Sequence, residues 1–283
     1  MPYPGAIETN ITPAAPTGTT VTGSGTAHTK GAWAELIAAT GAASDGIWVA
    51  IRSVGASGTD TGILLDIGIG AAASETVHVP DINGGYAGDT SSMGQLRFIP
   101  ILTASGVRVS ARLQGVVTTE TALVSIWLSQ SIQHLTGAVA VEAVGEDGAA
   151  SQGTSVTSGN NAWGSWTNMG TISADRNLFM PGVDGLGDTS FAGSDDDILL
   201  ELGHGTTAPD SGGTAIPGAY RWATNTGEEM FGPVPNVPVY ADLASGETLW
   251  ARMSSGNAVV RGVVIHAMEG VAVAGGGSTL IRR

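Results

Sequence analysis

The segment ILLDIGIG at residues 63–70 decides the interpretation of this chain, because a close copy of it occurs again. The copy, ILLELGHG, occupies residues 198–205. Three further short matches follow each copy in the same order. IPI at residues 99–101 matches VPV at 237–239, ASG at 104–106 matches ASG at 244–246, and ARL at 111–113 matches ARM at 251–253. Two matches at nearly constant spacing predict a tandem duplication of one domain of roughly 110 residues, a common domain size.

The composition favours short strands joined by tight turns. Only 13% of the residues are charged, and 43 of the 283 residues are glycine, which supplies turn conformations and weakens helices. The net charge of −14 argues against nucleic acid and against anionic membrane surfaces as partners. The chain contains no cysteine, so it has neither a disulfide framework nor thiol chemistry.

Residues 1–29 are rich in proline, threonine, glycine and alanine and carry few large apolar side chains. Such a segment cannot build a core by itself. We therefore expect an extended arm, either a disordered tail or an anchor that orders against a partner. The first residues lack the basic start and apolar core of a secretory signal, and no apolar run is long enough for a transmembrane helix.

The remaining pattern predicts an all-β fold. In residues 47–54, Ile47, Val49 and Ile51 share one face at the strand period, and residues 107–113 alternate between apolar and polar side chains. Residues 63–69 are apolar almost throughout, as in a strand buried on both faces. Six to eight such strands per repeat predict two tandem antiparallel β-sandwich (jelly-roll-like) domains from an internal duplication, with an extended N-terminal arm. The predicted divisions are an arm (1–29), a first domain (30–135), a linker (136–160), a second domain (161–274) and a glycine-rich tail (275–283).

Two carboxylates occupy equivalent positions in the repeated apolar strand, Asp66 in the first copy and Glu201 in the second. A buried carboxylate is costly unless it is paired. Arg112 and Arg252 are also equivalent to each other, so we expect the structural pairs Asp66–Arg112 and Glu201–Arg252. One carboxylate beside an arginine is not an acid–base pair, and glycosidase chemistry needs two carboxyl groups at a set separation.

Other candidate sites are weaker. Asp195, Asp196 and Asp197 could supply oxygen ligands to Ca²⁺, but their spacing is not that of an EF-hand loop, and a solvated acidic turn ahead of a strand explains them better. The five histidines show no metal-ligand spacing. Nucleophile-elbow, Walker A and dinucleotide-binding motifs are absent, so we expect no catalytic residues and no cofactor.

Aromatic residues are concentrated in the second half of the chain, and Tyr220, Trp222 and Phe231 lie in its largest predicted loop region. They could form a glycan-stacking face or a subunit contact, or they could fill the core of a domain that has few other large side chains.

Residues 63–70, followed by Glu75, Pro80, Pro100, Gly106 and the segment 108–112, resemble uncharacterised structural proteins of tailed bacteriophages. Those proteins carry a strand of the form LLVDIGVGAAGSE and then a strand of the form FP…I..G.R…R. The resemblance covers roughly residues 30–130, with a more diverged copy over residues 160–270. It implies a virion component such as a capsid decoration protein, a head spike or fibre, or a tail-fibre module, and it implies nothing catalytic.

The sequence therefore predicts a non-enzymatic virion structural protein, docked on capsid or tail proteins through its N-terminal arm and assembled in the host cytoplasm. A homotrimer or another symmetric oligomer is expected. The alternative is a tail-fibre or baseplate module that recognises a host glycan, and a depolymerase is a third, more distant interpretation.

Overall fold

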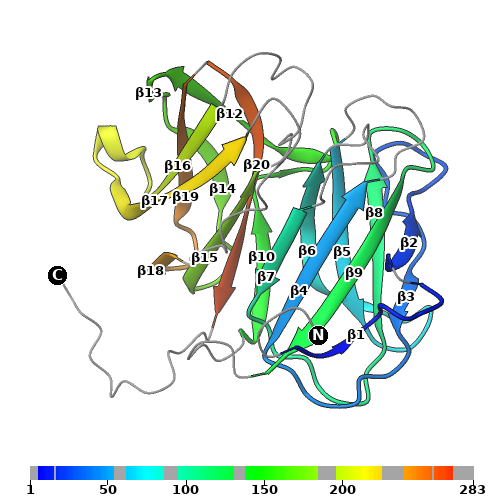
Figure 1. Cartoon of the computed structure of the whole chain (residues 1–283). Coiled ribbons are helices and arrows are strands. Elements are labelled where there is room, and N and C mark those ends of the chain that lie inside the picture. Colours follow the sequence, from blue (N-terminus) through cyan, green and yellow to red (C-terminus); the bar gives the residue numbers. More distant parts are fainter. Residues whose placement is uncertain are drawn as a thin grey trace.

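The computed structural model describes residues 6–15, 17–53, 62–85, 95–130, 138–183, 196–224, 239–256 and 258–269. Within these ranges the chain forms strands and one short 3₁₀ turn, Pro209–Ser211. The strands build two sandwiches that lie side by side (Figure 1). The predicted all-β sandwich fold is confirmed. The described residues contain no helix that is long and apolar enough to cross a membrane.

The first sandwich is made of nine strands in two sheets. Its strands are β1 (Ala6–Thr9), β2 (Thr19–Thr22), β3 (Ala34–Ile37), β4 (Gly46–Ser53), β5 (Gly62–Ile69), β6 (Thr76–Gly85), β7 (Gln95–Ile99), β8 (Val109–Gly115) and β9 (Thr121–Ser129). Sheet 1 has the order β1-β9-β4-β7, with β2 also paired to β9, and sheet 2 has the order β3-β8-β5-β6. All pairings in both sheets are antiparallel.

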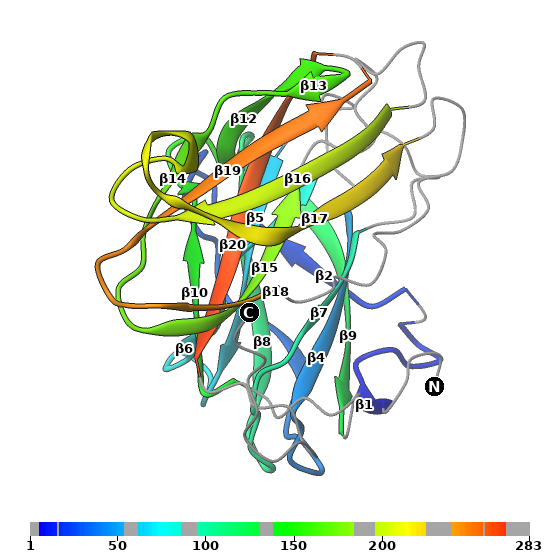
Figure 2. The ribbon, with the colours of Figure 1, turned by 90° about the vertical axis from the view of Figure 1, so that its left-hand side faces the viewer.

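The second sandwich is made of the strands that follow. They are β10 (Ala140–Val144), β11 (Glu146–Asp147), β12 (Gln152–Asn160), β13 (Ala162–Trp163), β14 (Thr167–Thr171), β15 (Arg176–Val183), β16 (Asp196–His204), β17 (Thr214–Thr224), β18 (Val239–Leu243), β19 (Thr248–Ser255) and β20 (Val260–Glu269). Sheet 3 contains β10 and β12 on one side of β20, then β15 and β18 on the other. Sheet 4 has β17, β16 and β19 in order, with β13 and β14 along β19 (Figure 2). The last residues of β12 pair in parallel with β19, so β12 joins the two sheets.

The strand order of the first sandwich recurs in the second. β9 has β1 and β2 on one side and β4 on the other, and β20 has β10 and β12 on one side and β15 on the other. The correspondence extends to single hydrogen bonds. Glu8 of β1 accepts a bond from the backbone N–H of Gly41, and Glu142 of β10 accepts one from the backbone N–H of Ser173. The two halves are therefore copies of one unit of nine strand positions.

This correspondence corrects two predictions from the sequence. The arm predicted at residues 1–29 contains β1 and β2, which pair with β9 inside sheet 1. The linker predicted at residues 136–160 contains β10 and most of β12, the equivalent strands of sheet 3. Thr19 and Thr154 lie in stretches of small and polar residues, which gave no periodic apolar signal in the sequence. The predicted tail, residues 275–283, lies outside the described residues.

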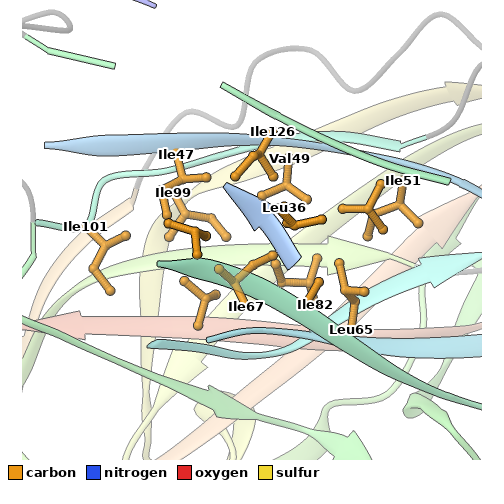
Figure 3. Close-up of a cluster of buried hydrophobic side chains, with 14 of the residues drawn as sticks. Leu36, Ile47, Val49, Ile51, Leu65, Ile67, Ile82, Ile99, Ile101 and Ile126 are labelled. Atoms are coloured by element: carbon orange, nitrogen blue, oxygen red, sulfur yellow. The ribbon is translucent and has the colours of Figure 1, made fainter. Parts of the chain in front are cut away.

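The first sandwich encloses a core of isoleucine, valine and leucine side chains from its two sheets. Figure 3 shows Ile47, Val49 and Ile51 of β4 facing Leu65 and Ile67 of β5 across the interior. The strand at residues 62–69 is buried along nearly its whole length, as its apolar run predicted. The exclusion of these side chains from water is the main driving force for closing the two sheets on each other.

The core of the first sandwich also includes side chains from the second. Leu178 and Met180 of β15 and Met268 of β20 are buried in the same cluster as the residues of sheets 1 and 2. β10, β15 and β20 contact β6, and Gly182 of β15 lies against Arg97 of β7. Sheet 3 therefore closes the open side of the first sandwich, where the edge strands β6 and β7 end its two sheets. Its opposite face covers the separate core of the second sandwich.

Candidate functional site

Each sandwich carries a cluster of a carboxylate, an arginine and tryptophan on the outer face of one sheet. Along β5, Ile63, Leu65 and Ile67 point into the core, so Asp66 points to the outer face of sheet 2. Asp66 is directly opposite Arg112 of β8, and Glu201 is directly opposite Arg252 of β19. Cross-strand neighbours on one face lie within reach of each other, which explains why both predicted pairs form.

The first cluster is closely packed and holds more charges than the sequence suggested. Arg112 Nε lies 2.9 Å from Asp66 Oδ2, and Lys30 Nζ lies 2.7 Å from Asp66 Oδ1. Lys30 also contacts Asp81 Oδ1 at 2.7 Å, and the backbone N–H of Asp81 donates to Asp66. The guanidinium of Arg112 lies 4.5 Å from the centre of the Trp33 ring. Asp66 is only 2% exposed, so its charge is balanced by direct partners rather than by water.

The second cluster has fewer charges and more aromatic surface. Arg252 Nε and Nη2 contact Glu201 Oε2, both at 2.6 Å. The guanidinium lies 4.5 Å from the Trp166 ring and 4.9 Å from the Trp163 ring. The Trp163 side chain is 38% exposed, and those of Glu201 and Arg252 are 20% and 27% exposed. The arginine is thus held by cation–π contacts with two indole rings, and part of this surface stays open to water.

The two clusters occupy equivalent places in the repeat. The backbone N–H of Gly31 donates to Leu113 O in the first copy, and that of Gly164 donates to Met253 O in the second. The residue before each glycine is Lys30 in one copy and Trp163 in the other. A lysine that bridges two carboxylates in the first sandwich is therefore replaced by an exposed tryptophan in the second.

The second sandwich lies over the outer face of sheet 2 near the first cluster. The Ser151 hydroxyl lies 3.0 Å from His28 Nδ1, and Gln114 Nε2 donates to the Gly148 carbonyl at 2.8 Å. Burial, followed by the negative charges of Asp81 and Glu142, raises the pKa of Glu146 above its ordinary value. The segment between β10 and β12 thus brings polar groups onto the first cluster, and the two sandwiches are joined here as well as through sheet 3.

The remaining predicted residues are not assembled into a site within the described residues. Asp195 lies outside them, and Asp196 and Asp197 are described only as backbone at the start of β16. The backbone of Tyr220 and Trp222 belongs to β17, opposite Leu200 and Ile198, whereas Phe231 lies outside the described residues.

In the described ranges, no group of three or more histidine, aspartate and glutamate side chains is arranged to hold a metal ion. His28 forms a hydrogen bond with Ser151, and His204 forms one with Glu247. His78 bonds to Thr103. His266 is fully buried where sheet 3 meets β6, and its Nε2 donates to the Pro80 carbonyl at 2.8 Å. The desolvation of buried His266, helped by the positive charge of Arg97, lowers its pKa to about 4.

Sequence reasoning found the two ion pairs but missed Lys30, Trp33, Trp163 and Trp166 as their neighbours. The available signal was the shared spacing of the tryptophans from the repeated strand, with Trp33 and Trp166 lying 33 and 35 residues before Asp66 and Glu201.

Comparisons with known proteins do not identify a family. No protein-family profile matches the sequence, and no curated protein matches it. A search of solved structures finds similarity to a structure titled "Structure of PNGF-II in P21 space group", with a TM-score of 0.36 and 8% sequence identity. That match covers 83% of this chain and 59% of the other chain. A TM-score this low carries no argument about fold or function.

Proposed function

We propose that the chain is a non-catalytic structural component of a tailed-phage virion, as a capsid decoration protein or a head spike or fibre protein. Its main support in the structure is the core that the two sandwiches share through Leu178, Met180 and Met268. A chain built this way is one compact block, which suits a part that is docked repeatedly on a particle. The sequence resemblance to phage structural proteins supports the same proposal.

The proposed anchor needs a different form from the one expected from the sequence. Residues 6–9 and 19–22 are strands of sheet 1, so removing residues 1–29 would remove part of the fold. Residues 1–5 precede β1 and can be deleted without removing a described strand. We propose that docking uses this end of the chain and the surface next to β1, with capsid or tail proteins as the partner.

Co-sedimentation with phage particles tests this proposal. Purified, labelled protein is mixed with particles that lack it and is then separated on a density gradient. Saturable co-sedimentation that weakens when residues 1–5 are deleted, and not when residues 275–283 are deleted, would support the proposal. The proposal would be overturned if the protein stayed at the top of the gradient both in a mixture with purified phage heads and in a mixture with purified tails.

The second cluster favours one alternative function, recognition of a glycan on the host surface. Indole rings stack on the apolar faces of sugars, and arginine and carboxylate groups bond to their hydroxyls. Trp163 and Trp166 around Arg252 supply both kinds of group on an open face. Titration of host polysaccharide into wild-type protein and Trp163→Ala tests this directly. Binding that disappears in the variant supports the alternative, and no binding by the wild type rejects it.

A further inference from the structure

Lys30 of the first cluster is the only lysine in the sequence, and every other residue in the lysine and arginine total of 11 is arginine. The two side chains differ in chemistry. A guanidinium group stays charged, whereas a lysine amine can lose a proton and then attack a carbonyl carbon. The one position at which this chain uses lysine is therefore the one at which amine chemistry is available.

The structure holds the Lys30 amine against two carboxylates at once. Nζ lies 2.7 Å from Asp66 Oδ1 and 2.7 Å from Asp81 Oδ1. The next residue, Gly31, donates its backbone N–H to the Leu113 carbonyl of β8 at 2.8 Å, so the lysine is held near its Cα as well as at its amine. Two groups fixed in contact within one molecule react as if each were present at a very high concentration.

Asp66 has the surroundings that an acceptor of the amine needs. Arg112 Nε lies 2.9 Å from Oδ2, and the backbone N–H of Asp81 donates to Oδ1 at 3.0 Å. Donors on both oxygens stabilise the negative charge that develops when a nucleophile adds to the carboxyl carbon. The side chain of Asp66 is only 3% exposed, so water has little access to hydrolyse a bond formed there.

Asp81 is placed to carry protons between these two groups. Its carboxylate contacts the amine, and its backbone N–H contacts Asp66. Its φ of 45° is uncommon for a residue other than glycine, and strained residues of this kind are concentrated at functional sites. The second copy has Trp163 at the position of Lys30, so the equivalent amine is missing there.

We propose that Lys30 and Asp66 condense into an amide bond in the folded chain. Asp81 accepts a proton from the Lys30 ammonium group and passes it to Asp66 Oδ1. The freed electron pair of Nζ forms a bond to Asp66 Cγ, and the π electrons of the carbonyl move to Oδ2, where Arg112 stabilises the charge. When these electrons return, the bond from Cγ to Oδ1 breaks, and Oδ1 leaves as water with a second proton that Asp81 carries from Nζ. One ammonium and one carboxylate thus give one amide and one water, and no further reactant is needed.

Such a bond would tie the segment before β3 to β5, an inner strand of sheet 2. A covalent cross-link stabilises a fold mainly by restricting the unfolded chain, as a disulfide does, and this chain has no cysteine to form one. The inference does not depend on the proposed virion role, because the reaction needs only the folded chain.

Mass spectrometry of the denatured full-length protein tests the inference. The mass of the wild type should be lower than that of its sequence by one water molecule. An amine-specific label should then attach only at the N-terminal amine, whereas the unlinked chain offers Lys30 as a second site. A cyclic imide formed at an aspartate also loses water, but mild alkali hydrolyses it and leaves an amide intact. The lower mass should therefore persist after alkaline treatment.

Tryptic peptides locate the bond. Trypsin does not cleave after a lysine whose amine is acylated, so residues 1–52 should remain one peptide, joined to residues 53–97. Fragmentation of the joined peptides should place the link at Asp66. A link at Asp81 would contradict the assigned roles and overturn the proposal.

Three variants separate the roles. Lys30→Arg keeps the cation but cannot form the amide, so it should have the full mass of its sequence. Asp81→Asn removes the proton carrier, and asparagine tolerates a positive φ, so linking should be about 100-fold slower. Glu35→Gln is the control, since Glu35 pairs with Arg108 instead, and it should link as the wild type does.

Two results would overturn the proposal. One is a folded wild type that keeps the full mass of its sequence and two reactive amines after prolonged incubation. The other is an Asp81→Asn variant that links as fast as the wild type. The first result needs no variant, so it decides the question even if a substitution disturbs folding.

Discussion

The clusters around Asp66 and Glu201 are the same feature of the repeat in two different settings. In the first copy, two cations and Asp81 surround a carboxylate that is 2% exposed, and the second sandwich lies beside it. In the second copy, Arg252 forms an ion pair with Glu201, and Trp163 and Trp166 lie beside it where the first copy has further charged side chains. The two clusters differ in charge and also in their surroundings, since in the described structure only the first cluster lies beside another sandwich.

The comparison teaches that a duplicated motif can diverge according to what lies over it. A carboxylate that is shielded from water needs several ionic partners, whereas one that remains at a water-accessible face needs only one. At the position equivalent to Lys30 the second copy has Trp163, which carries no charge and adds aromatic surface. The first cluster therefore contributes mainly to stability, and the second is available for contact with another molecule.

Neutralising the two carboxylates should give the largest difference between the copies. Asp66→Asn removes a carboxylate that is only 2% exposed, leaves Arg112 facing a neutral group and leaves Lys30 with Asp81 alone, and we expect a loss of about 3 kcal/mol in the free energy of unfolding. Glu201→Gln is the matched variant in the partly exposed cluster, with an expected loss of about 1 kcal/mol or less. Urea unfolding of both proteins measures the contrast, and equal losses would contradict the assignment of different roles.

Acidification should weaken the contact between the sandwiches. His266 has a pKa of about 4 in the folded protein against an ordinary value near 6.5, so the unfolded chain binds its proton first. The contribution of neutral His266 to the free energy of unfolding is therefore complete above pH 6.5. It decreases as the pH drops from 6.5 to 4, by about 3 kcal/mol in total.

His78 has a similarly lowered pKa, about 4, because of burial, and it adds to the same slope. His266→Gln keeps a donor near Pro80 and cannot titrate. Unfolding measured between pH 4 and 7 should therefore show a shallower slope in this variant, and an unchanged slope would exclude His266 as a source.

A methyl group at Gly68 should disturb the first cluster without changing any charge. A Cβ there would lie 2.6 Å from the Trp33 ring, which must move away from Arg112. We expect Gly68→Ala to cost about 2 kcal/mol, the usual range for overpacking. Gly25→Ala is the control, since a Cβ at Gly25 meets nothing within 4 Å. Thermal unfolding of the two variants should differ clearly, and similar curves would show that Trp33 is not held by this contact.

Removing Trp163 should have the smallest effect on stability. Arg252 keeps Trp166 and Glu201, so Trp163→Ala should lower the free energy of unfolding by only about 0.5–1 kcal/mol. A loss as large as that of Asp66→Asn would mean that the second cluster is also structural, and it would remove the reason to regard it as a binding surface.

Much of this fold could be predicted from repetition and alternation. The copy of residues 63–70 at 198–205 showed which buried strands are equivalent. The pairing of Asp66 with Arg112 could be predicted because Glu201 and Arg252 occupy the equivalent positions in the second copy. What could not be predicted was the position of the strands that contain Thr19 and Thr154, since these stretches carry no periodic apolar pattern.

The sequence also gave no sign that Leu178 and Met268 would enter the core of the other sandwich, because an apolar residue in a strand does not indicate which neighbour covers it. Lys30 likewise has no partner nearby in the sequence, and its two carboxylates lie 36 and 51 residues away. Such contacts depend on how the two sandwiches meet, which is a property of the folded chain.

Differential scanning calorimetry tests the central claim, that sheet 3 completes the core of the first sandwich and makes the two sandwiches one unit. The account predicts a single transition whose calorimetric and van't Hoff enthalpies agree, because the core of the first sandwich is incomplete without Leu178, Met180 and Met268, and these side chains become exposed to water when the first sandwich unfolds. Two separate transitions, each with the enthalpy expected of about half the chain, would show that the sandwiches unfold independently and would contradict the shared core.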